Sequence, residues 1–144
     1  MKTPKFSAVL LAVPLALGAL AAVPATAQPY SPLARPEAAA ARIPLTNVDE
    51  GRTVTVRPGD DVEVRLTAYR GDGFTYSWEV PQSSAPGVLR STAGGVTPAG
   101  NATAVFHAQG VGSATITAVR HCRPDPGRTC PFAVVPWKVT ADVK

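Results

Sequence analysis

The segment from Gly59 to Val80 holds two runs in which apolar and polar residues alternate, joined by a short glycine-rich stretch. The first run is Asp61–Ala68 and the second is Thr75–Val80. A period of two places every second side chain on one face of a β-strand, so that one face enters a core while the other meets water. The segment therefore predicts an antiparallel strand pair of a small β-sandwich, with an exposed loop at its tip.

Further short runs of the same kind are separated by clusters of glycine and proline. About seven or eight short antiparallel strands, with a turn about every 8–12 residues, are typical of a β-sandwich, and a small closed barrel is the alternative. The glycines and proline of Thr92–Asn101 predict a long loop, and Pro136 predicts an edge position or a bulge in the last strand. The other predicted strands are Ile43–Val48, Arg52–Val56, Val88–Ser91, Ala102–Gln109, Ser113–Arg120 and Phe132–Val143.

The first 27 residues have the pattern of a secretory signal peptide of bacterial type. Two lysines precede the nearly continuous apolar run Ala8–Val23, and Ala25–Ala27 is a small-x-small cleavage site. We expect cleavage before about Gln28, a secreted product and no membrane insertion after cleavage. A membrane anchor is the alternative, which the short apolar run and its interruption by Pro14 and Pro24 disfavour.

The remaining chain divides into a tether and one domain. Gln28–Arg42 is rich in proline and alanine, which predicts a tether, and residues 43–144 are enough for one sandwich core. The whole chain has a net charge of +4, and removal of the two signal-peptide lysines leaves 12 basic against 10 acidic residues, or +2. Because the charges are interspersed, we expect no nucleic-acid binding.

Cys122 and Cys130 are the only cysteines of the sequence. In an exported protein such a pair is expected to be oxidised. The bridge would close a short loop and stabilise the fold by about 2.5 kcal/mol on the chain-entropy estimate. The alternative is a metal site formed with His121, which lacks a clear fourth ligand. We therefore expect a disulfide, and neither a metal nor a cofactor.

The sequence offers little for catalysis. It contains no Gly-x-Ser-x-Gly elbow, no His-Glu-x-x-His motif and no phosphate-binding loop. The acidic pairs Asp49–Glu50 and Asp60–Asp61 both fall in predicted turns, where carboxylates cap and solvate strand ends. We therefore expect a protein that is not an enzyme.

Several short motifs, taken in order, resemble the chagasin-type inhibitors of papain-like cysteine peptidases. They are Gly59–Leu66, then Tyr76–Glu79, then Phe106–Ala108 and, beyond Gly112, Ala114–Ile116. The resemblance covers roughly residues 53–143. It implies an immunoglobulin-like sandwich that inhibits by inserting three loops from one of its ends into the peptidase cleft.

The resemblance places the three loops at Tyr69–Thr75, Thr92–Asn101 and His121–Pro131. The first has Gly71–Thr75 where the family has Asn-Pro-Thr-Thr-Gly, and the second ends in a single glycine of the family's Gly-x-Gly-Gly. The third has Arg-Pro followed by Asp125 instead of an aromatic residue. The contact residues that the resemblance implies are Arg70, Gly71, Asp72, Gly73, Phe74, Thr97, Gly100, Arg123 and Pro124.

The first functional hypothesis is a secreted, monomeric protein-binding module that inhibits a cysteine peptidase by occluding its cleft. The alternative is a non-inhibitory structural or adhesive immunoglobulin-like domain of the bacterial cell envelope. A small-ligand or carbohydrate binder ranks third, because it needs exposed aromatic residues. With Trp78 expected in the core, only Trp137, Tyr69 and Phe74 remain for that role. The integrin-type tripeptide Arg70–Asp72 is too short to carry a hypothesis.

Overall fold

The structure is a computed structural model, and it describes Ala25, Ala27 and residues 38–144. The predicted signal peptide and most of the predicted tether lie outside the described residues, so cleavage and secretion stay predictions. Within the described part of the chain, no helix is long and apolar enough to cross a membrane.

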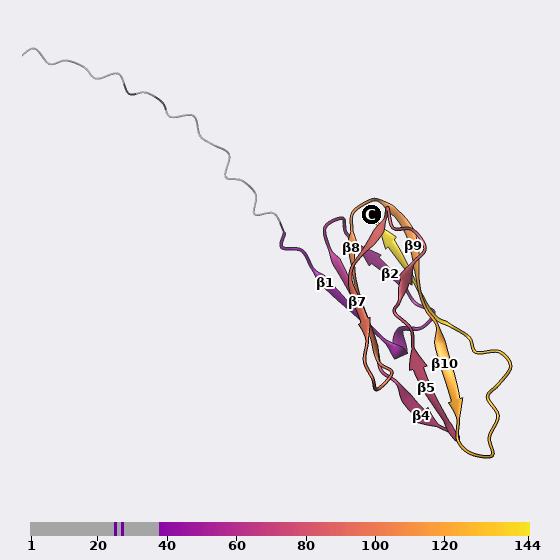
Figure 1. The fold of residues 1–144 in the computed structure, drawn as a ribbon. Helices are drawn as coiled ribbons and strands as arrows, with labels where there is room; N and C mark the ends of the chain where they lie inside the picture. The colour runs from indigo at the N-terminus through magenta and orange to yellow at the C-terminus, as the bar shows by residue number, and fades with distance from the viewer. Residues whose placement is uncertain (1–24, 26, 28–37) are drawn as a thin grey trace, which may run out of the picture. The chain divides into compact units, whose positions relative to one another are not determined.

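Eleven strands and one short 3₁₀ helix occur in the described residues, and the strands form three sheets (Figure 1). We call these sheet A (β1-β3-β8-β7), sheet B (β2-β11-β9-β6) and sheet C (β10-β5-β4). The elements are β1 (Arg42–Thr46), η1 (Asn47–Asp49), β2 (Thr53–Val56), β3 (Asp61–Leu66), β4 (Tyr69–Gly71), β5 (Phe74–Trp78), β6 (Gln82–Ser83), β7 (Leu89–Val96), β8 (Ala102–Ala108), β9 (Gly112–Ala118), β10 (Arg120–Pro124) and β11 (Trp137–Val143).

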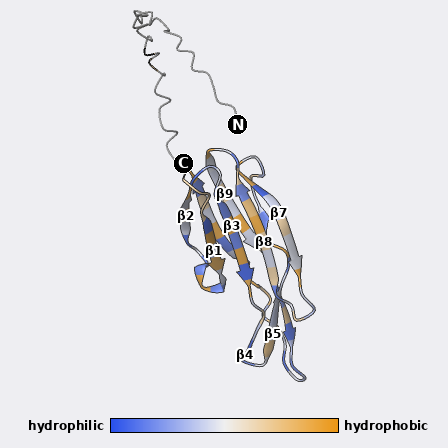
Figure 2. Ribbon diagram, turned by 90° about the vertical axis from the view of Figure 1, so that its left-hand side faces the viewer, coloured by the Kyte–Doolittle hydropathy of each residue, from blue (hydrophilic) through white to orange (hydrophobic). Residues whose placement is uncertain are grey.

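Sheets A and B each bury one face in a shared hydrophobic core. Every second residue of β8, β9 and β11 is buried, and Figure 2 shows hydrophobic and hydrophilic residues interleaved along the strands. Trp137 and Phe106 are the largest side chains that are fully buried. The indole N–H of Trp137 donates to the carbonyl oxygen of Thr46 at 3.1 Å, so its polar atom is satisfied inside the core. The all-β sandwich is confirmed, since neither sheet closes into a barrel.

Two of the strand pairings are parallel, whereas the sequence predicted antiparallel strands throughout. β1 pairs with β3 in sheet A, and β2 pairs with β11 in sheet B. The predicted pairing of Asp61–Ala68 with Thr75–Val80 was also wrong, because β3 lies in sheet A and β5 in sheet C. The chain changes sheet between β1 and β2, where the predicted strand Ile43–Val48 ends early at Thr46. There the carboxylate of Asp49 accepts the Thr46 backbone N–H at 2.7 Å and turns the chain into η1.

The predicted loop Thr92–Asn101 was wrong over its first half, because β7 continues to Val96 with one irregularity between Ser91 and Ala93. The glycines that suggested a loop serve another purpose. A Cβ atom at Gly94 would lie 2.8 Å from Cγ1 of Val80. The missing side chain lets β7 approach Val80, which lies between β5 and β6, closely, so glycine here indicates packing and not a turn.

The predicted last strand, Phe132–Val143, was wrong at its start, because β11 begins only at Trp137. β11 lies between β2 and β9 and is not an edge strand. Pro136 precedes it, so the proline removes no N–H from the ladder and needs neither an edge nor a bulge. The predicted strand Ser113–Arg120 is divided into β9 and β10, which lie in different sheets.

Candidate functional site

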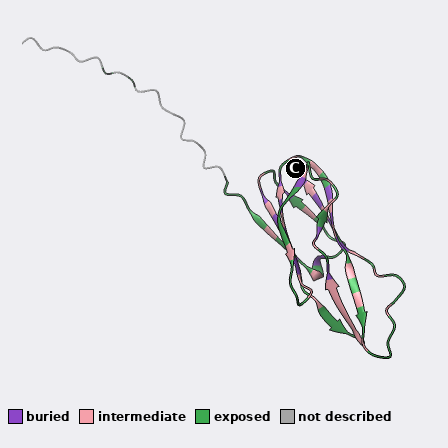
Figure 3. Cartoon of the chain, viewed as in Figure 1, coloured by how far each residue is buried: buried purple, intermediate pink, exposed green. Residues whose placement is uncertain are grey.

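Sheet C forms a ribbon at the end of the sandwich where β4, β5 and β10 lie in Figure 1. It continues sheet B, because β9 runs through Val119 directly into β10. The backbone N–H of Glu79 donates to the carbonyl oxygen of Val119 at 2.9 Å and joins the two sheets at this point. Most residues of the ribbon are exposed or half-buried, whereas the sandwich core is buried (Figure 3).

An aromatic cluster holds the ribbon to the core. Trp78 is 5% exposed, and its indole N–H donates to the carbonyl oxygen of Thr67 at 3.0 Å, as expected for a core tryptophan. The guanidinium of Arg120 lies over the rings of Tyr76 and Trp78, at 5.2 and 5.7 Å from their centroids. It also donates to the hydroxyl of Tyr69 at 2.8 Å. These contacts fix β5 and β10 against each other.

The first predicted loop, Tyr69–Thr75, is a tight hairpin between β4 and β5 and not a flexible loop. Its two central residues have positive φ, +54° at Asp72 and +82° at Gly73. An Asp-Gly pair favours this type of two-residue turn, because its twist matches that of the flanking strands. The turn places Phe74 at the start of β5, where it is half-buried.

The second predicted loop is a short turn that is bound to β5. Within the turn, the backbone N–H of Gly100 donates to the carbonyl oxygen of Thr97 at 2.9 Å. The carbonyl oxygen of Gly100 in turn accepts the backbone N–H of Trp78 at 2.9 Å. The approach is close enough that a Cβ atom at Gly100 would lie 2.6 Å from Cβ of Ser77. The turn therefore packs directly on β5, the second strand of the first hairpin.

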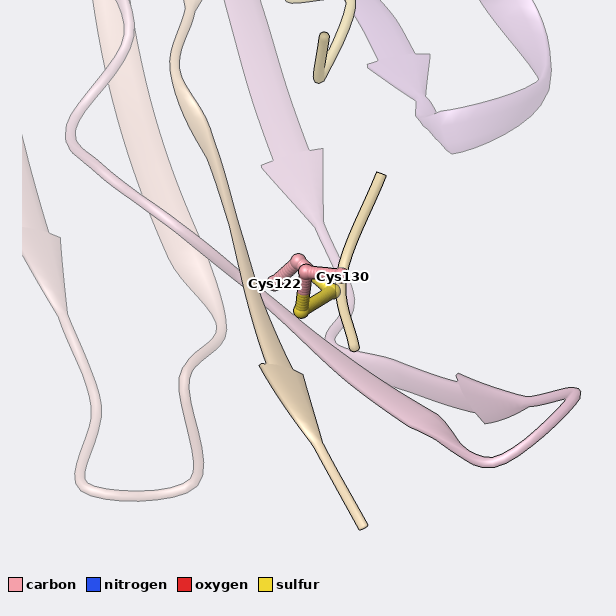
Figure 4. The surroundings of a disulfide bond; sticks show 2 residues. All are labelled: Cys122 and Cys130. Carbon is pink, nitrogen blue, oxygen red and sulfur yellow. A yellow bond between two sulfur atoms is a disulfide. The ribbon is translucent and has the colours of Figure 1, made fainter. Parts of the chain in front are cut away.

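The third segment, His121–Pro131, is fixed by a disulfide within it and by contacts to the first hairpin. The disulfide between Cys122 and Cys130 is present, with 6.1 Å between the two Cα atoms (Figure 4). The backbone N–H of Asp125 donates to the carbonyl oxygen of Gly73 at 2.9 Å. The Asp125 carboxylate also pairs with the guanidinium of Arg70 at 2.6 Å. The third segment is thus joined to the tip of the first hairpin.

The disulfide decides between the two sequence-based interpretations of the cysteines. Both sulfur atoms are engaged, so the metal-site alternative was wrong. His121, its third candidate ligand, pairs instead through Nε2 with Oε1 of Glu79 at 2.7 Å. Across residues 38–144, moreover, no group of three or more histidine, cysteine or acidic residues is placed to hold a metal ion.

Sequence reasoning missed one exposed apolar segment. Phe132 is fully exposed, and Val135 is 61% exposed, although both were assigned to a half-buried strand. The segment lies between Pro131 and Pro136. Two prolines around a short apolar run were the available signal, because proline removes backbone donors and disfavours a place inside a ladder.

The structure brings the three predicted loops together at one end, although they are far apart in the sequence. A cavity between the second turn and sheet C has walls from all three regions. Of the aromatics considered for a carbohydrate site, Trp137 is only 1% exposed and lies in the core, and Phe74 is half-buried, whereas Tyr69 is 39% exposed and stacks on Tyr76 at 4.8 Å. The predicted contact residues found at this end are Arg70, Gly71, Asp72, Gly73, Phe74, Thr97, Gly100, Arg123 and Pro124.

Comparison of the sequence with models of protein families and with curated proteins finds no match. Among solved structures, the chain is similar to the crystal structure of the cysteine protease inhibitor EhICP2 from Entamoeba histolytica. The TM-score is 0.51 at 13% identity, and the match covers 72% of this chain and 96% of that one. The solution structure of amebosin matches with a TM-score of 0.48 at 19% identity, over 72% of this chain and 98% of that one. The predicted resemblance to the scaffold of the inhibitors is confirmed at the level of the fold.

Proposed function

We propose that this chain is a secreted inhibitor of papain-like cysteine peptidases that occludes the active-site cleft with the ribbon end of its sandwich. One observation carries the proposal. Three segments that are distant in sequence meet at one end and are joined there by specific contacts, on a fold shared with a cysteine protease inhibitor. The exposed loops of a rigid scaffold are where small sandwich domains usually bind partners.

The contacts within this end support a wedge that is ordered before binding. The hairpin turn, the Arg70–Asp125 ion pair and the Cys122–Cys130 disulfide each restrict a segment that would otherwise lose freedom in the complex. Ordering of flexible side chains and loops on binding costs affinity, and a pre-ordered surface avoids most of that cost. Occlusion needs no catalytic group on the inhibitor, so the proposal includes no enzymatic activity, and it takes a single copy of the chain as the unit that enters the cleft.

One observation favours a second candidate, a structural or adhesive immunoglobulin-like module. The residue after Arg123-Pro124 is Asp125, and its carboxylate is already engaged by Arg70 within the same molecule. In the resemblance this position carries an aromatic residue. Because this ion pair is already formed within the molecule, its two charges are not available to a partner, which suits a static module better than an inhibitor.

Titration of papain activity with the mature chain, residues 28–144, tests the proposal. We expect stoichiometric and reversible loss of activity against a fluorogenic substrate. The double variant Arg123→Ala/Phe74→Ala should inhibit more weakly while its circular dichroism spectrum stays unchanged. Arg90→Ala on β7 is a matched control that removes an exposed arginine from the side of the sandwich. No inhibition at micromolar concentration would favour the structural module, and full inhibition by the double variant would move the contact site elsewhere.

A further inference from the structure

A small open cavity of about 180 Å³ lies between the second turn and the exposed face of sheet C. One wall is the turn itself, and the other consists of side chains from β5 and β10. Its lining residues are Thr75, Ser77, Pro98, Ala99, Gly100 and Arg123.

The strand register explains why three polar side chains meet in this cavity. Arg123 of β10 lies directly opposite Thr75 of β5. Ser77 is two residues further along β5 and therefore on the same face of the sheet. The turn lies over this face of the sheet. It can come this close because Gly100 has no Cβ atom that would overlap with the Ser77 side chain. One guanidinium and two hydroxyl groups are thus presented side by side.

The neighbouring charges on this face are compensated, whereas that of Arg123 is not. Arg70 of β4 is the partner of Thr75 across the other edge of β5, on the same face of the sheet, and it pairs with Asp125. His121 pairs with Glu79. Among the residues that the structure describes, no carboxylate lies within ion-pair distance of Arg123. The side chains of Thr75 and Ser77 likewise make no hydrogen bond to another described residue.

This donor set fits a carboxylate. A guanidinium presents parallel N–H donors at the spacing of two carboxylate oxygens, and hydroxyl groups can donate to the remaining lone pairs. Pro98 and Ala99 form the opposite wall of the cavity and complete a recess of the size of a carboxylate group. We infer that the cavity binds an aspartate or glutamate side chain of the partner protein. The inference rests on the proposed function, since it names the group that this end recognises.

Acetate is the probe that tests the cavity by itself. In ¹⁵N-correlated spectra of the mature chain, sodium acetate should shift the backbone amides of Thr75, Ser77 and Gly100 along saturable curves. Sodium chloride at the same ionic strength should not. Arg123→Gln should abolish the acetate shifts, and the control Arg90→Gln should retain them. Linear shifts, or shifts that persist in Arg123→Gln, would overturn the inference.

The inhibition assay then tests whether Arg123 contributes to the complex with the peptidase. Arg123→Gln should raise the inhibition constant by about tenfold to a hundredfold, because a charge-assisted pair is lost. The inhibition constant of Arg123→Lys should lie between those of the wild type and Arg123→Gln, since lysine keeps the charge but not the paired donors. Inhibition without acetate binding would overturn the cavity inference and leave the proposed function standing. Acetate binding without inhibition of papain would support the cavity as a carboxylate site and count against the proposed function.

Discussion

The close approach of the second turn to β5 makes Gly100→Ala the most informative single change. Gly100 has a φ of +87°, which costs alanine about 1–2 kcal/mol. The new Cβ atom would also lie 2.6 Å from Cβ of Ser77, an overlap between two atoms that cannot rotate away. Overpacking of this kind typically costs a further 1–3 kcal/mol or so. We expect a total loss of about 2–5 kcal/mol in the free energy of unfolding.

Gly59→Ala is the matched control, because it separates the backbone cost from the overlap. Gly59 has a φ of +95°, and a Cβ atom there would meet nothing within 4 Å. This variant should lose only the backbone cost of about 1–2 kcal/mol. The difference between the two alanine variants then measures how tightly the turn rests on the strand.

Removal of the opposing atom completes the experiment. In Ser77→Gly/Gly100→Ala the overlap is gone, although the positive φ remains and Cβ of Ala68 still lies 3.4 Å away. The double variant should therefore be more stable than the sum of the single effects predicts, by about 1–3 kcal/mol. Urea unfolding followed by tryptophan fluorescence measures five proteins: the wild type, Ser77→Gly, Gly100→Ala, Ser77→Gly/Gly100→Ala and Gly59→Ala. Additive effects, or equal losses in Gly100→Ala and Gly59→Ala, would refute the packing of the turn on β5.

Three further changes test other parts of the structure. Cys122→Ser/Cys130→Ser should lower the free energy of unfolding by about 2.5 kcal/mol in urea melts, and the wild type in reductant should match it. The backbone N–H of Thr46, with Arg52, holds the pKa of Asp49 below its usual 3.8. The ionised Asp49 carboxylate therefore stabilises the fold above the pKa that it has in the unfolded chain, and this stabilisation is lost as the pH falls through its lower pKa in the folded state. Asp49→Asn should therefore make the free energy of unfolding depend less steeply on pH in acid. Trp137→Phe should cost about 1–3 kcal/mol in thermal melts, because the part-buried hydrogen bond from the indole N–H to the Thr46 carbonyl oxygen is lost. A Trp137→Phe protein as stable as the wild type would contradict that assignment.

The strands of the core could be predicted from the sequence because each has one buried face. Asp61–Leu66, Ala102–Ala108 and Gly112–Ala118 follow the period of two closely, and the structure has them within one or two residues of the predicted bounds. The parallel pairings could not be read in this way. A period of two says which face is buried, but not which sheet a strand joins once the chain turns at Asp49.

The composition of the site was more predictable than its geometry. The pair Asp72-Gly73 is itself a signal for a two-residue hairpin turn, although Tyr69–Thr75 was predicted only as an exposed loop. The Arg70–Asp125 pair and the placement of Arg123 beside the second turn depend on contacts across distant parts of the chain. Such contacts have no signature in residue spacing, because they arise only when the sheets have formed.

If the ribbon end enters the cleft of a papain-like peptidase, filling that cleft beforehand must prevent binding. Calorimetric titration of the mature chain into papain tests it most directly, with the free enzyme compared against enzyme whose cleft is filled by a covalent peptidyl inhibitor. We expect one-to-one binding to the free enzyme and no measurable binding to the filled one. Equal binding to both forms, or to neither, would contradict it.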